Sequence, residues 1–423
     1  MDFDLSVEEQ LWQRKVRSFL EEHWDQAHND EIFEGIALAD RVGGDPVAVD
    51  FSKRLGEQGW LTVTWPRDYG GMGLTARQEL IFMQELDRVG APHLDLDVTE
   101  IAAIIIHFGT EDNKQRWLPK IASREIKFAI GYSEPDAGTD LASLATRAVL
   151  DGDEWVVNGT KLWNTEAHLA THEWMLVRTS SERARHSGLS LMIVPMDAEG
   201  VSYGEVKTWG EIRTNQTFFD NVRVPRSYLV GEVDQGWKYI SAALDLHRIK
   251  VGFSQHLVSL VEDLRRYCAR TVVDGKVLLD RPEVRQQLAQ FMVEVDLVNL
   301  LSWEIAESLD RGESPTVSAT AQKVLSSELR ARLADFAMST YGLGGLVRRG
   351  DPRAPMKGLG EFLYRRTPRL RFAGGTNEVM RDIVAQRGLG LPRSARRAPS
   401  TRTSAPALPE PVKEVASSGS HAG

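Results

Sequence analysis

The sequence is poor in cysteine and in long apolar runs. Cys268 is the only cysteine among 423 residues, so an internal disulfide is impossible and zinc sites built on paired cysteines are excluded. The longest apolar patch, Ile101–Phe108, is far shorter than the about 20 residues that a membrane-spanning helix needs. The N-terminus, MDFDLSVEEQ, lacks the basic start and apolar core of a signal peptide. We therefore expect a cytoplasmic protein in a reducing compartment, with no membrane span and no metal site.

An excess of positive charge is also absent. The chain carries 51 Lys and Arg against 60 Asp and Glu, a formal net charge of −9. Binding to a nucleic-acid backbone requires a basic surface that neutralises phosphates, so we expect no nucleic-acid partner. Anionic small molecules remain possible through local basic loops. The composition is otherwise that of a globular protein with several cores, since 42% of residues are hydrophobic and 26% are charged.

The sequence pattern changes twice along the chain. Residues 1–127 carry helical apolar spacing, residues 128–235 carry short apolar runs bounded by turn residues, and residues 236–392 return to long helix-compatible segments. Residues 393–423 are rich in Ser, Ala and Pro, a composition typical of a disordered tail. We predict an α+β multi-domain fold with a helical, a β and a second helical domain in that order.

Local signals locate several of these elements. Ser6 and Glu9 have the spacing of a capping box. Helices are predicted at Thr75–Val89, ended by Gly90, at Val98–Phe108, ended by Gly109, and at Trp237–Tyr267, Arg285–Leu309 and Ser314–Tyr341. The stretch EWVVNGTKLW (154–163) predicts a β-hairpin that turns at Asn-Gly.

Two glycine-containing loops are candidates for ligand binding. In FAIGYSEPDAGTDLASLATRA (128–148), Pro135 and Gly138 predict a tight turn after a strand, where Ser133 and Thr139 offer hydroxyls. Such a turn suits a ring with many acceptor atoms or a diphosphate, although by composition a polar surface turn is equally compatible. In FAGGTNEVMRD (372–382), two glycines can bring backbone N–H groups against a ligand but carry no reactive side chain.

With these loops in view, the chain closely resembles the acyl-CoA dehydrogenase family over about residues 3–392. Its Ser133–Asp140 stretch matches the family's Ser/Thr-Glu-Pro-x-Ala-Gly-Ser/Thr-Asp motif. Further matching stretches are GWLTVTWPRDYGGMG (59–73), GTEDNKQRWLPKIASRE (109–125), KLWNTEAH (161–168), FFDNVRVP (218–225), TYGLGG (340–345) and GTNEVMRDIVAQRGL (375–389). The resemblance implies an N-terminal helical domain, a central antiparallel β-barrel or sandwich, and a C-terminal four-helix bundle. Within the family the chain is similar to actinobacterial subunits that act on steroid side chains.

The resemblance implies a bound FAD. The positions that match the family's flavin contacts are Tyr132, Ser133, Thr139, Trp163, Asn164, Thr165, Thr376 and Glu378, and Gly344 and Gly345 match a turn that approaches the ADP of a neighbouring subunit's cofactor. For Trp163 alone, core packing is the competing interpretation. The family's Arg-x-x-Phe-Gly motif has no match here, and Arg281 or Arg285 could replace its arginine at the diphosphate; either is equally compatible with a solvated helix end.

The resemblance also implies α,β-dehydrogenation of an acyl-CoA thioester, with hydride transfer to flavin N5. Thr139, Asp245, Arg248 and Gly375 match substrate contacts. The family's usual catalytic Glu stands at the position of Gly374, and a second subset places it at the position of His247. Both carboxylates are thus expected to be missing. His247 could accept the proton, because a neutral imidazole is a competent base near neutral pH, although a lone helical His is more often structural.

Other residues could complete the site. Asp95, Asp97 and Glu100 precede or begin the helix that borders the acyl pocket in this family, although capping of that helix explains them as well. A loop with Arg183, Arg185 and His186 matches the region that binds the adenosine phosphate of CoA.

Three functions remain open. The chain is a working dehydrogenase with an unusual base, a base-lacking subunit of a mixed assembly, or a flavoprotein with other chemistry such as desulfination or oxygenation. The missing side chain at Gly374 would leave room for a branched or bulky acyl group, as in lipid or steroid catabolism. The family implies an electron-transferring flavoprotein as acceptor and a homo- or hetero-tetramer.

Overall fold

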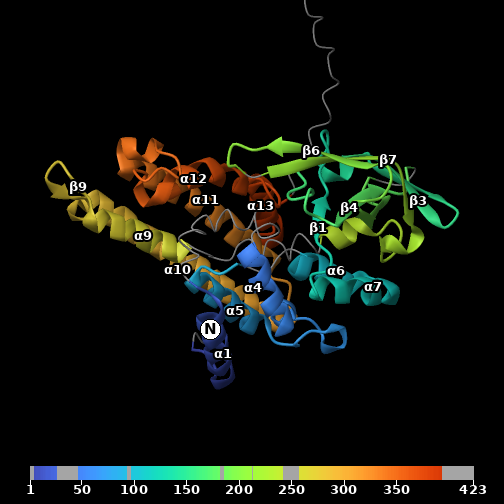
Figure 1. Ribbon diagram of the computed structural model, residues 1–423, viewed down its shortest axis with the longest axis horizontal. Coiled ribbons are helices and arrows are strands. Elements are labelled where there is room, and N and C mark those ends of the chain that lie inside the picture. The colour runs from blue at the N-terminus through green and yellow to red at the C-terminus, as the bar shows by residue number, and fades with distance from the viewer. Residues whose placement is uncertain are drawn as a thin grey trace, which may run out of the picture.

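The computed structural model describes residues 4–25, 46–92, 97–181, 185–211, 213–241 and 257–392. Helices precede and follow the main block of strands, β1 to β8, so the predicted α+β fold with a helical, a β and a second helical domain is confirmed. In Figure 1 the β-domain lies at one end of the molecule, the C-terminal helices extend to the other end, and α1, α4 and α5 lie below them.

The N-terminal helices begin at side-chain caps that the sequence encodes. Ser6, Thr75 and Thr110 each form a capping box with the residue three positions later, which satisfies N–H groups that have no partner inside a helix. The predicted helix end at Gly90 is confirmed, since Gly90 takes the left-handed conformation there. The elements are α1 (Val7–His23), α4 (Pro46–Glu57), η1 (Trp60–Thr62), η2 (Arg67–Tyr69), α5 (Ala76–Val89), the π-helix η3 (Asp97–Ile101), α6 (Ala102–Phe108) and α7 (Glu111–Ala122).

The β-domain is one mixed sheet buried on both faces at its centre. Its strands are β1 (Phe128–Gly131), β2 (Arg147–Asp151), β3 (Glu154–Leu162), β4 (His172–Arg178), β5 (Leu189–Pro195), β6 (Val201–Lys207), β7 (Arg213–Pro225) and β8 (Leu229–Val230). The order is β6-β7-β3-β2-β4-β5-β8, with β1 parallel to β4. On β4, Trp174 and Leu176 share a core with the N-terminal helices, whereas Met175 and Val177 belong to a core on the other side. This alternation joins the two domains through one sheet face.

The predicted hairpin at Asn158-Gly159 is wrong. Strand β3 runs through both residues and carries a bulge between Val157 and Gly159. A Cβ on Gly159 would lie 2.4 Å from the Thr146 hydroxyl oxygen, so this glycine permits close approach of the residue that precedes β2. The chain turns instead at Gly152, which has a φ of +63°.

The C-terminal helices form a second packed unit. They are α9 (Leu257–Arg270), α10 (Pro282–Asp310), α11 (Thr316–Tyr341), α12 (Leu359–Arg366) and α13 (Asn377–Ile383), with a small hairpin of β9 (Val272–Val273) and β10 (Lys276–Val277). Shorter segments are η4 (Leu141–Ser143) and η5 (Arg226–Tyr228) in the β-domain, then η6 (Leu278–Asp280), η7 (Gly342–Leu346), η8 (Pro355–Gly358), η9 (Thr367–Arg371) and the π-helix η10 (Val384–Gly388). Leu264, Phe291 and Leu333 meet in their core. The middle of the predicted helix 237–267 falls on residues 242–256, outside the described part of the chain.

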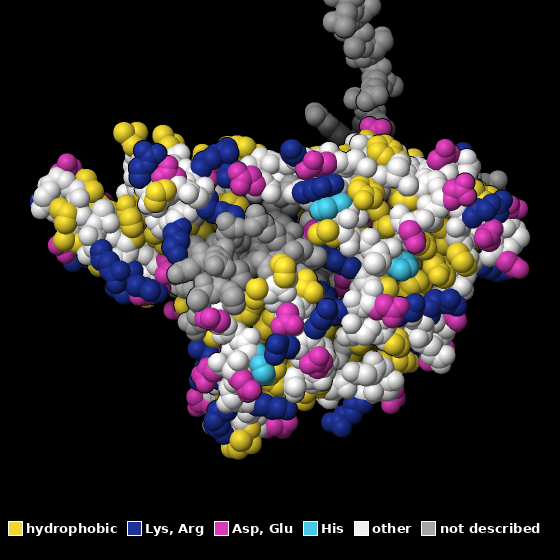
Figure 2. All heavy atoms as spheres, viewed as in Figure 1, with side chains coloured by type: hydrophobic (Ala, Val, Ile, Leu, Met, Phe, Trp, Pro, Cys, Tyr) yellow, Lys and Arg dark blue, Asp and Glu magenta, His cyan; other side chains and the backbone are white. Residues whose placement is uncertain are grey.

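Two surface properties bear on the sequence-based expectations. In the described ranges, no helix combines the length and apolar character needed to cross a membrane. On the face in Figure 2, basic and acidic side chains are interspersed.

Candidate cofactor and substrate site

The Ser133–Asp140 turn is held by its own glutamate. The backbone N–H of Glu134 donates to the Ala137 carbonyl at 2.9 Å, and the Ala137 N–H returns a bond of 3.1 Å. The Glu134 carboxylate then accepts from the backbone N–H groups of Ala145 at 2.6 Å and Thr146 at 2.9 Å. These bonds fix the Glu134–Ala137 part of the turn and attach it to the segment before β2.

A fully buried lysine anchors this turn to β3. Lys161 Nζ lies 2.9 Å from Glu134 Oε1 and 3.1 Å from the Tyr132 carbonyl oxygen. Burial alone would raise the pKa of Glu134, but the Lys161 ammonium and the backbone donors hold that pKa below its usual value. Burial lowers the pKa of Lys161, and Glu134 opposes that shift. The pair stays charged because each group supplies the other's counterion.

The outer surface of the turn offers donors and an aromatic face. In the part of the chain that the structure describes, the hydroxyls of Ser133, Thr139 and Thr165 make no hydrogen bond. Trp163 follows β3 with a φ of +71°, and 55% of its surface is exposed. Unbonded hydroxyls beside an exposed indole suit a flat ring with acceptor atoms, so these residues fit a flavin.

Tyr132 connects the turn to the N-terminal helical domain. Its hydroxyl accepts from Trp174 Nε1 at 2.8 Å and bonds the Glu100 carboxylate. Burial and the Glu100 charge raise its pKa well above the usual value, so the phenol stays neutral. Of the acids considered as alternative bases, Glu100 thus has a structural partner, and Asp97 accepts from the Phe128 N–H at 3.3 Å. Asp95 lies outside the described residues.

Asn164 lies beneath the same surface, bonded to a second buried carboxyl. Its Nδ2 donates to the Ile130 carbonyl at 2.8 Å and to Glu173 Oε1 at 2.9 Å. Thr217 Oγ1 donates to Glu173 Oε1 at 3.1 Å. Glu173 is fully buried, and burial raises its pKa to about 8, opposed by Thr217 and Lys161.

Glu173 is expected to make stability fall as pH rises. Its pKa in the folded chain is about 8, whereas an unfolded glutamate has a pKa of about 4.3. At pH values between these two pKa values, the unfolded chain has released the Glu173 proton and the folded chain still holds it. The free energy of unfolding therefore falls by about 1.4 kcal/mol for each pH unit, until the pH reaches the folded pKa. The free energy of unfolding, measured with urea, should fall from pH 6 to pH 8 by about 2–3 kcal/mol more in the wild type than in Glu173→Gln. The exposed Glu57→Gln is the control, and an equal gain there would contradict the expectation.

The second glycine loop is held by another buried lysine. Gly374 and Gly375 have φ values of +66° and +100°, and Thr376 caps α13 by accepting from the Val379 N–H at 3.2 Å. Lys323 Nζ donates to the Gly375 carbonyl at 2.8 Å and to Asn377 Oδ1 at 2.7 Å. The turn's shape therefore depends on a side chain 52 residues away in sequence.

The third glycine segment adjoins a basic cavity. Gly344 packs against Pro355, where an added Cβ would lie 2.9 Å from Pro355 Cγ, and Gly345 is buried. A cavity of about 490 Å³ opens beside it. It is lined by Asp263, Arg266, Tyr267, Arg270, Thr271, Met356 and Lys357. Met356 and Lys357 have φ values of +45° and +56°, a strained geometry that often marks functional segments.

The other predicted residues are distributed as follows. Four of them lie outside the described residues: Asp245, His247, Arg248 and Arg183. Glu378 is exposed in the first turn of α13. Arg185 forms an ion pair with Asp140, and the His186 ring lies 4.4 Å from that of Trp237. Arg281 donates to the Val273 carbonyl at 3.0 Å, and Arg285 is in the first turn of α10. Neither of these two arginines lines the cavity.

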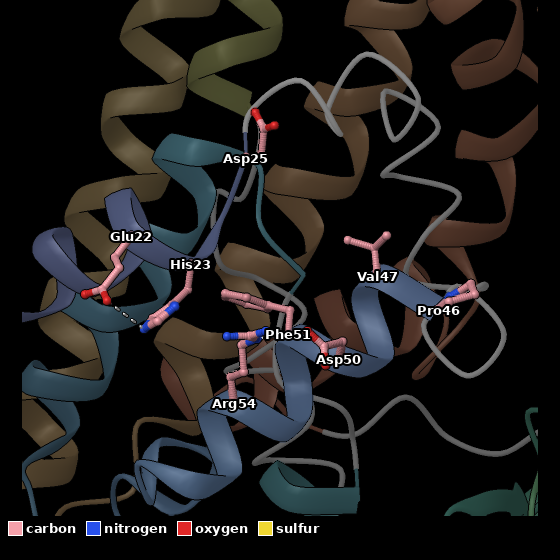
Figure 3. A pocket seen from close by; sticks show the side chains of 8 residues that line it. All are labelled: Glu22, His23, Asp25, Pro46, Val47, Asp50, Phe51 and Arg54. Atoms are coloured by element: carbon pink, nitrogen blue, oxygen red, sulfur yellow. Dashed lines mark hydrogen bonds and ion pairs between the residues drawn. The ribbon is translucent and has the colours of Figure 1, made fainter.

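A separate surface hollow lies between α1 and α4. It has a volume of about 450 Å³ and includes His23, Phe51 and Arg54. Figure 3 shows the His23 ring turned toward Glu22, at 3.9 Å, and Arg54 beside Asp50. None of the predicted cofactor or substrate residues lies there. Elsewhere in the described ranges, no group of three or more His, Cys, Asp or Glu side chains could hold a metal ion.

Sequence reasoning did not identify Lys161, Glu173 or Lys323 as parts of the site. The sequence weakly indicates a role for Lys161, because this charged residue lies within an apolar strand pattern. Glu173 and Lys323 have none, since their partners come from distant segments. Arg266 and Arg270, rather than the predicted Arg281 or Arg285, line the basic cavity.

Comparisons with known proteins agree from residue 6 to residue 389. Models of the N-terminal, middle and C-terminal domains of acyl-CoA dehydrogenases match residues 6–125, 129–222 and 234–389. The acyl-CoA dehydrogenase FadE26 of Mycobacterium tuberculosis is 38% identical, covering 81% of this chain and 88% of its own length. A structure described as the Tcur3481–Tcur3483 steroid ACAD is 34% identical with a TM-score of 0.83, covering 93% of this chain and 100% of that chain. The ChsE4–ChsE5 complex of M. tuberculosis is 35% identical with a TM-score of 0.82, with the same coverage. The chain therefore belongs to the acyl-CoA dehydrogenase family.

Proposed function

We propose that the chain binds FAD and oxidises the α,β-bond of an acyl-CoA thioester. The observation that carries this proposal is the turn clamped by Glu134 and Lys161, which carries unbonded hydroxyls. Its Ser133 carbonyl accepts from the Leu162 N–H at 2.9 Å, one residue before the exposed Trp163. Family members are FAD-dependent, and the arrangement suits the flavin ring for the reasons given above. Bound FAD would supply the two-electron oxidation.

The chain's own residues would orient the substrate and handle its proton. Backbone N–H groups of the Gly374–Thr376 turn would donate to the thioester oxygen, where negative charge develops as the α-proton leaves. That role requires no side chain, so Gly374 can fulfil it. Gly374 contributes no base, and on the sequence match His247 is the proposed proton acceptor.

A bulky acyl group is the proposed substrate class. Gly374 has no side chain, which leaves volume where the family commonly carries a Glu. One of the similar solved structures, with 34% identity and a TM-score of 0.83, is a steroid ACAD. A branched or polycyclic acyl chain would use that volume.

A second candidate function is that of one subunit in a mixed assembly. The two similar structures described above each pair two differently named chains. If this chain also pairs with a different subunit, the partner would provide the base and this chain the flavin contacts or the scaffold. A tetramer and an electron-transferring flavoprotein as acceptor are part of both proposals.

Absorbance spectroscopy with anaerobic addition of acyl-CoAs separates these functions. Flavin bleaching by the chain alone, abolished in His247→Ala, supports the unaided dehydrogenase. Bleaching only after co-expression with a companion chain supports the mixed assembly. A flavin that no thioester reduces would overturn both and leave a flavoprotein with different chemistry.

The basic cavity is the proposed site for the diphosphate of a neighbouring subunit's FAD. Arg270 lines it together with Met356, which directly follows the Pro355 that packs against Gly344. A guanidinium–phosphate bond contributes about 1.5–3 kcal/mol. Arg270→Gln is therefore expected to weaken FAD binding at least tenfold by fluorescence titration, with little change in unfolding temperature. Arg265→Gln on the same helix is the control, because Arg265 pairs with Glu262 and does not line the cavity. Equal FAD affinities in both variants would exclude Arg270 as a contact.

A further inference from the structure

Glu173 is a buried carboxyl that the proposed reaction does not use. It is the second residue of β4, and one oxygen accepts from both Asn164 and Thr217. The other oxygen, Oε2, has no hydrogen-bond partner in the described structure. A Cβ on Gly131 would lie 2.1 Å from Glu173 Oε1 and 2.9 Å from its Cδ. Strand β1 therefore needs glycine at this point to admit the carboxyl.

Asn164 connects this carboxyl to the cofactor-facing surface. Its side-chain N–H groups donate to the Ile130 carbonyl and to Glu173, and its Oδ1 lies 3.3 Å from Thr217 Oγ1, whose one proton it shares with Glu173. Its backbone N–H and carbonyl exchange bonds of 3.0 Å with Asn215. Asn164 therefore has one position, and the adjacent Trp163 and Thr165 are placed by it.

Trp163 needs such support. Its φ of +71° is strained for a residue with a bulky side chain, and such residues persist only where the surroundings fix them. More than half of the indole is exposed, so packing of the ring alone does not provide that support. The fixed Asn164 does.

The charges around Glu173 keep it neutral at physiological pH. Lys161 is the cation that faces it, but Lys161 is already bonded to Glu134 at 2.9 Å. On the β7 side, Asn215 contacts two titratable groups: Arg213, whose Nε donates to Asn215 Oδ1 at 3.3 Å, and His168, whose Nδ1 lies 3.4 Å from Asn215 Nδ2. Burial lowers the pKa of the His168 imidazole. Without a free counterion, burial raises the pKa of Glu173 to about 8.

We infer that Glu173 is a positioning residue for the cofactor, which acts through Asn164. The neutral carboxyl keeps Trp163 and Thr165 in the conformation that receives the flavin ring, and loss of its proton places an uncompensated buried charge under that surface. Stabilising this buried charge requires entry of water or a rearrangement of Asn164. Either change disturbs the surface that receives the flavin, so FAD affinity falls when Glu173 ionises. The inference rests on the proposed function, because it assumes that this surface binds flavin.

The test is FAD titration of the cofactor-free protein, with any companion subunit, at pH 6.5 and pH 9.0. Binding that requires the neutral form weakens about tenfold one pH unit above the pKa, so the wild type should lose about tenfold in affinity at pH 9.0. Glu173→Gln keeps the shape and the acceptor oxygen but cannot ionise. It should bind FAD equally at both pH values, with the wild-type affinity and the wild-type visible circular dichroism of pH 6.5.

A matched control separates Glu173 from its titratable neighbour. His168→Gln should keep the wild-type loss of affinity, and disappearance of the pH dependence in that variant would overturn the inference. The same pH dependence in Glu173→Gln as in the wild type would also overturn it, as would a wild type with equal affinities at both pH values. In these cases FAD still binds and the proposed function stands. Absence of FAD binding at either pH would instead remove the proposed function and the inference together.

Discussion

Replacing Lys161 with methionine is expected to lower the free energy of unfolding by about 3–5 kcal/mol, because it leaves a buried carboxylate without its counterion. Glu134 is 7% exposed at its side chain and Lys161 is 0% exposed. The backbone donors of Ala145 and Thr146 cannot replace a full positive charge. The turn should therefore loosen in the folded state as well, and FAD affinity should fall with stability. Urea unfolding and FAD titration measure the two effects.

The double variant Glu134→Gln with Lys161→Met tests whether the unpaired charge is the cause. A neutral amide retains an acceptor for the backbone donors, so the double variant should regain a large part of the lost stability. Arg223→Met is the surface control, since Arg223 pairs with Asp151 and Glu154 in solvent and such pairs contribute about 0–1 kcal/mol. A Lys161→Met protein with the wild-type urea midpoint would show that Glu134 and Lys161 do not act as a buried ion pair.

Local chemistry explains which parts of the fold could be predicted. The capping box at Ser6 and the helix end at Gly90 depend on residues within a few positions of each other, and both predictions are confirmed. The prediction of a hairpin at Asn158-Gly159 is wrong, because the contact that requires glycine at position 159 is made with a residue distant in sequence. Gly159 permits the close approach of Thr146, the residue that precedes β2, and the sequence does not reveal this contact.

The same distinction applies to the candidate site. The Ser133–Asp140 turn was predicted because its turn residues and its family motif are contiguous. The groups that hold the two loops are distant in sequence: Lys161 lies 27 residues from Glu134, and Lys323 lies 54 residues from Asn377. A buried lysine and a solvated lysine look alike in a sequence. Only the fold shows that these two are enclosed.

Lys323→Met is expected to reduce turnover about 100-fold, a larger effect than its loss of stability of about 2–4 kcal/mol. Lys323 is 2% exposed and donates to the Gly375 carbonyl and to Asn377 Oδ1, so the substitution leaves buried acceptors unsatisfied. The turn that carries Gly374 would then lose its fixed shape. A displacement of about 1 Å in a reacting geometry is enough for a 100-fold effect.

Comparison of the change in kcat with the change in KM in Lys323→Met distinguishes misplacement of the turn from general destabilisation of the protein. The turn's N–H groups are proposed to act on charge that develops at the thioester oxygen, so their misplacement should lower kcat far more than it raises KM. Lys120→Met is the matched control, because Lys120 pairs with Glu125 at the surface and its loss should change neither parameter. Stopped-flow reduction of the flavin by acyl-CoA, at a temperature where both variants are folded, isolates the chemical step. A Lys323→Met enzyme with normal kcat and raised KM would show that the turn contributes to ground-state binding alone, and the placement of the thioester oxygen at Gly374–Thr376 would then be wrong.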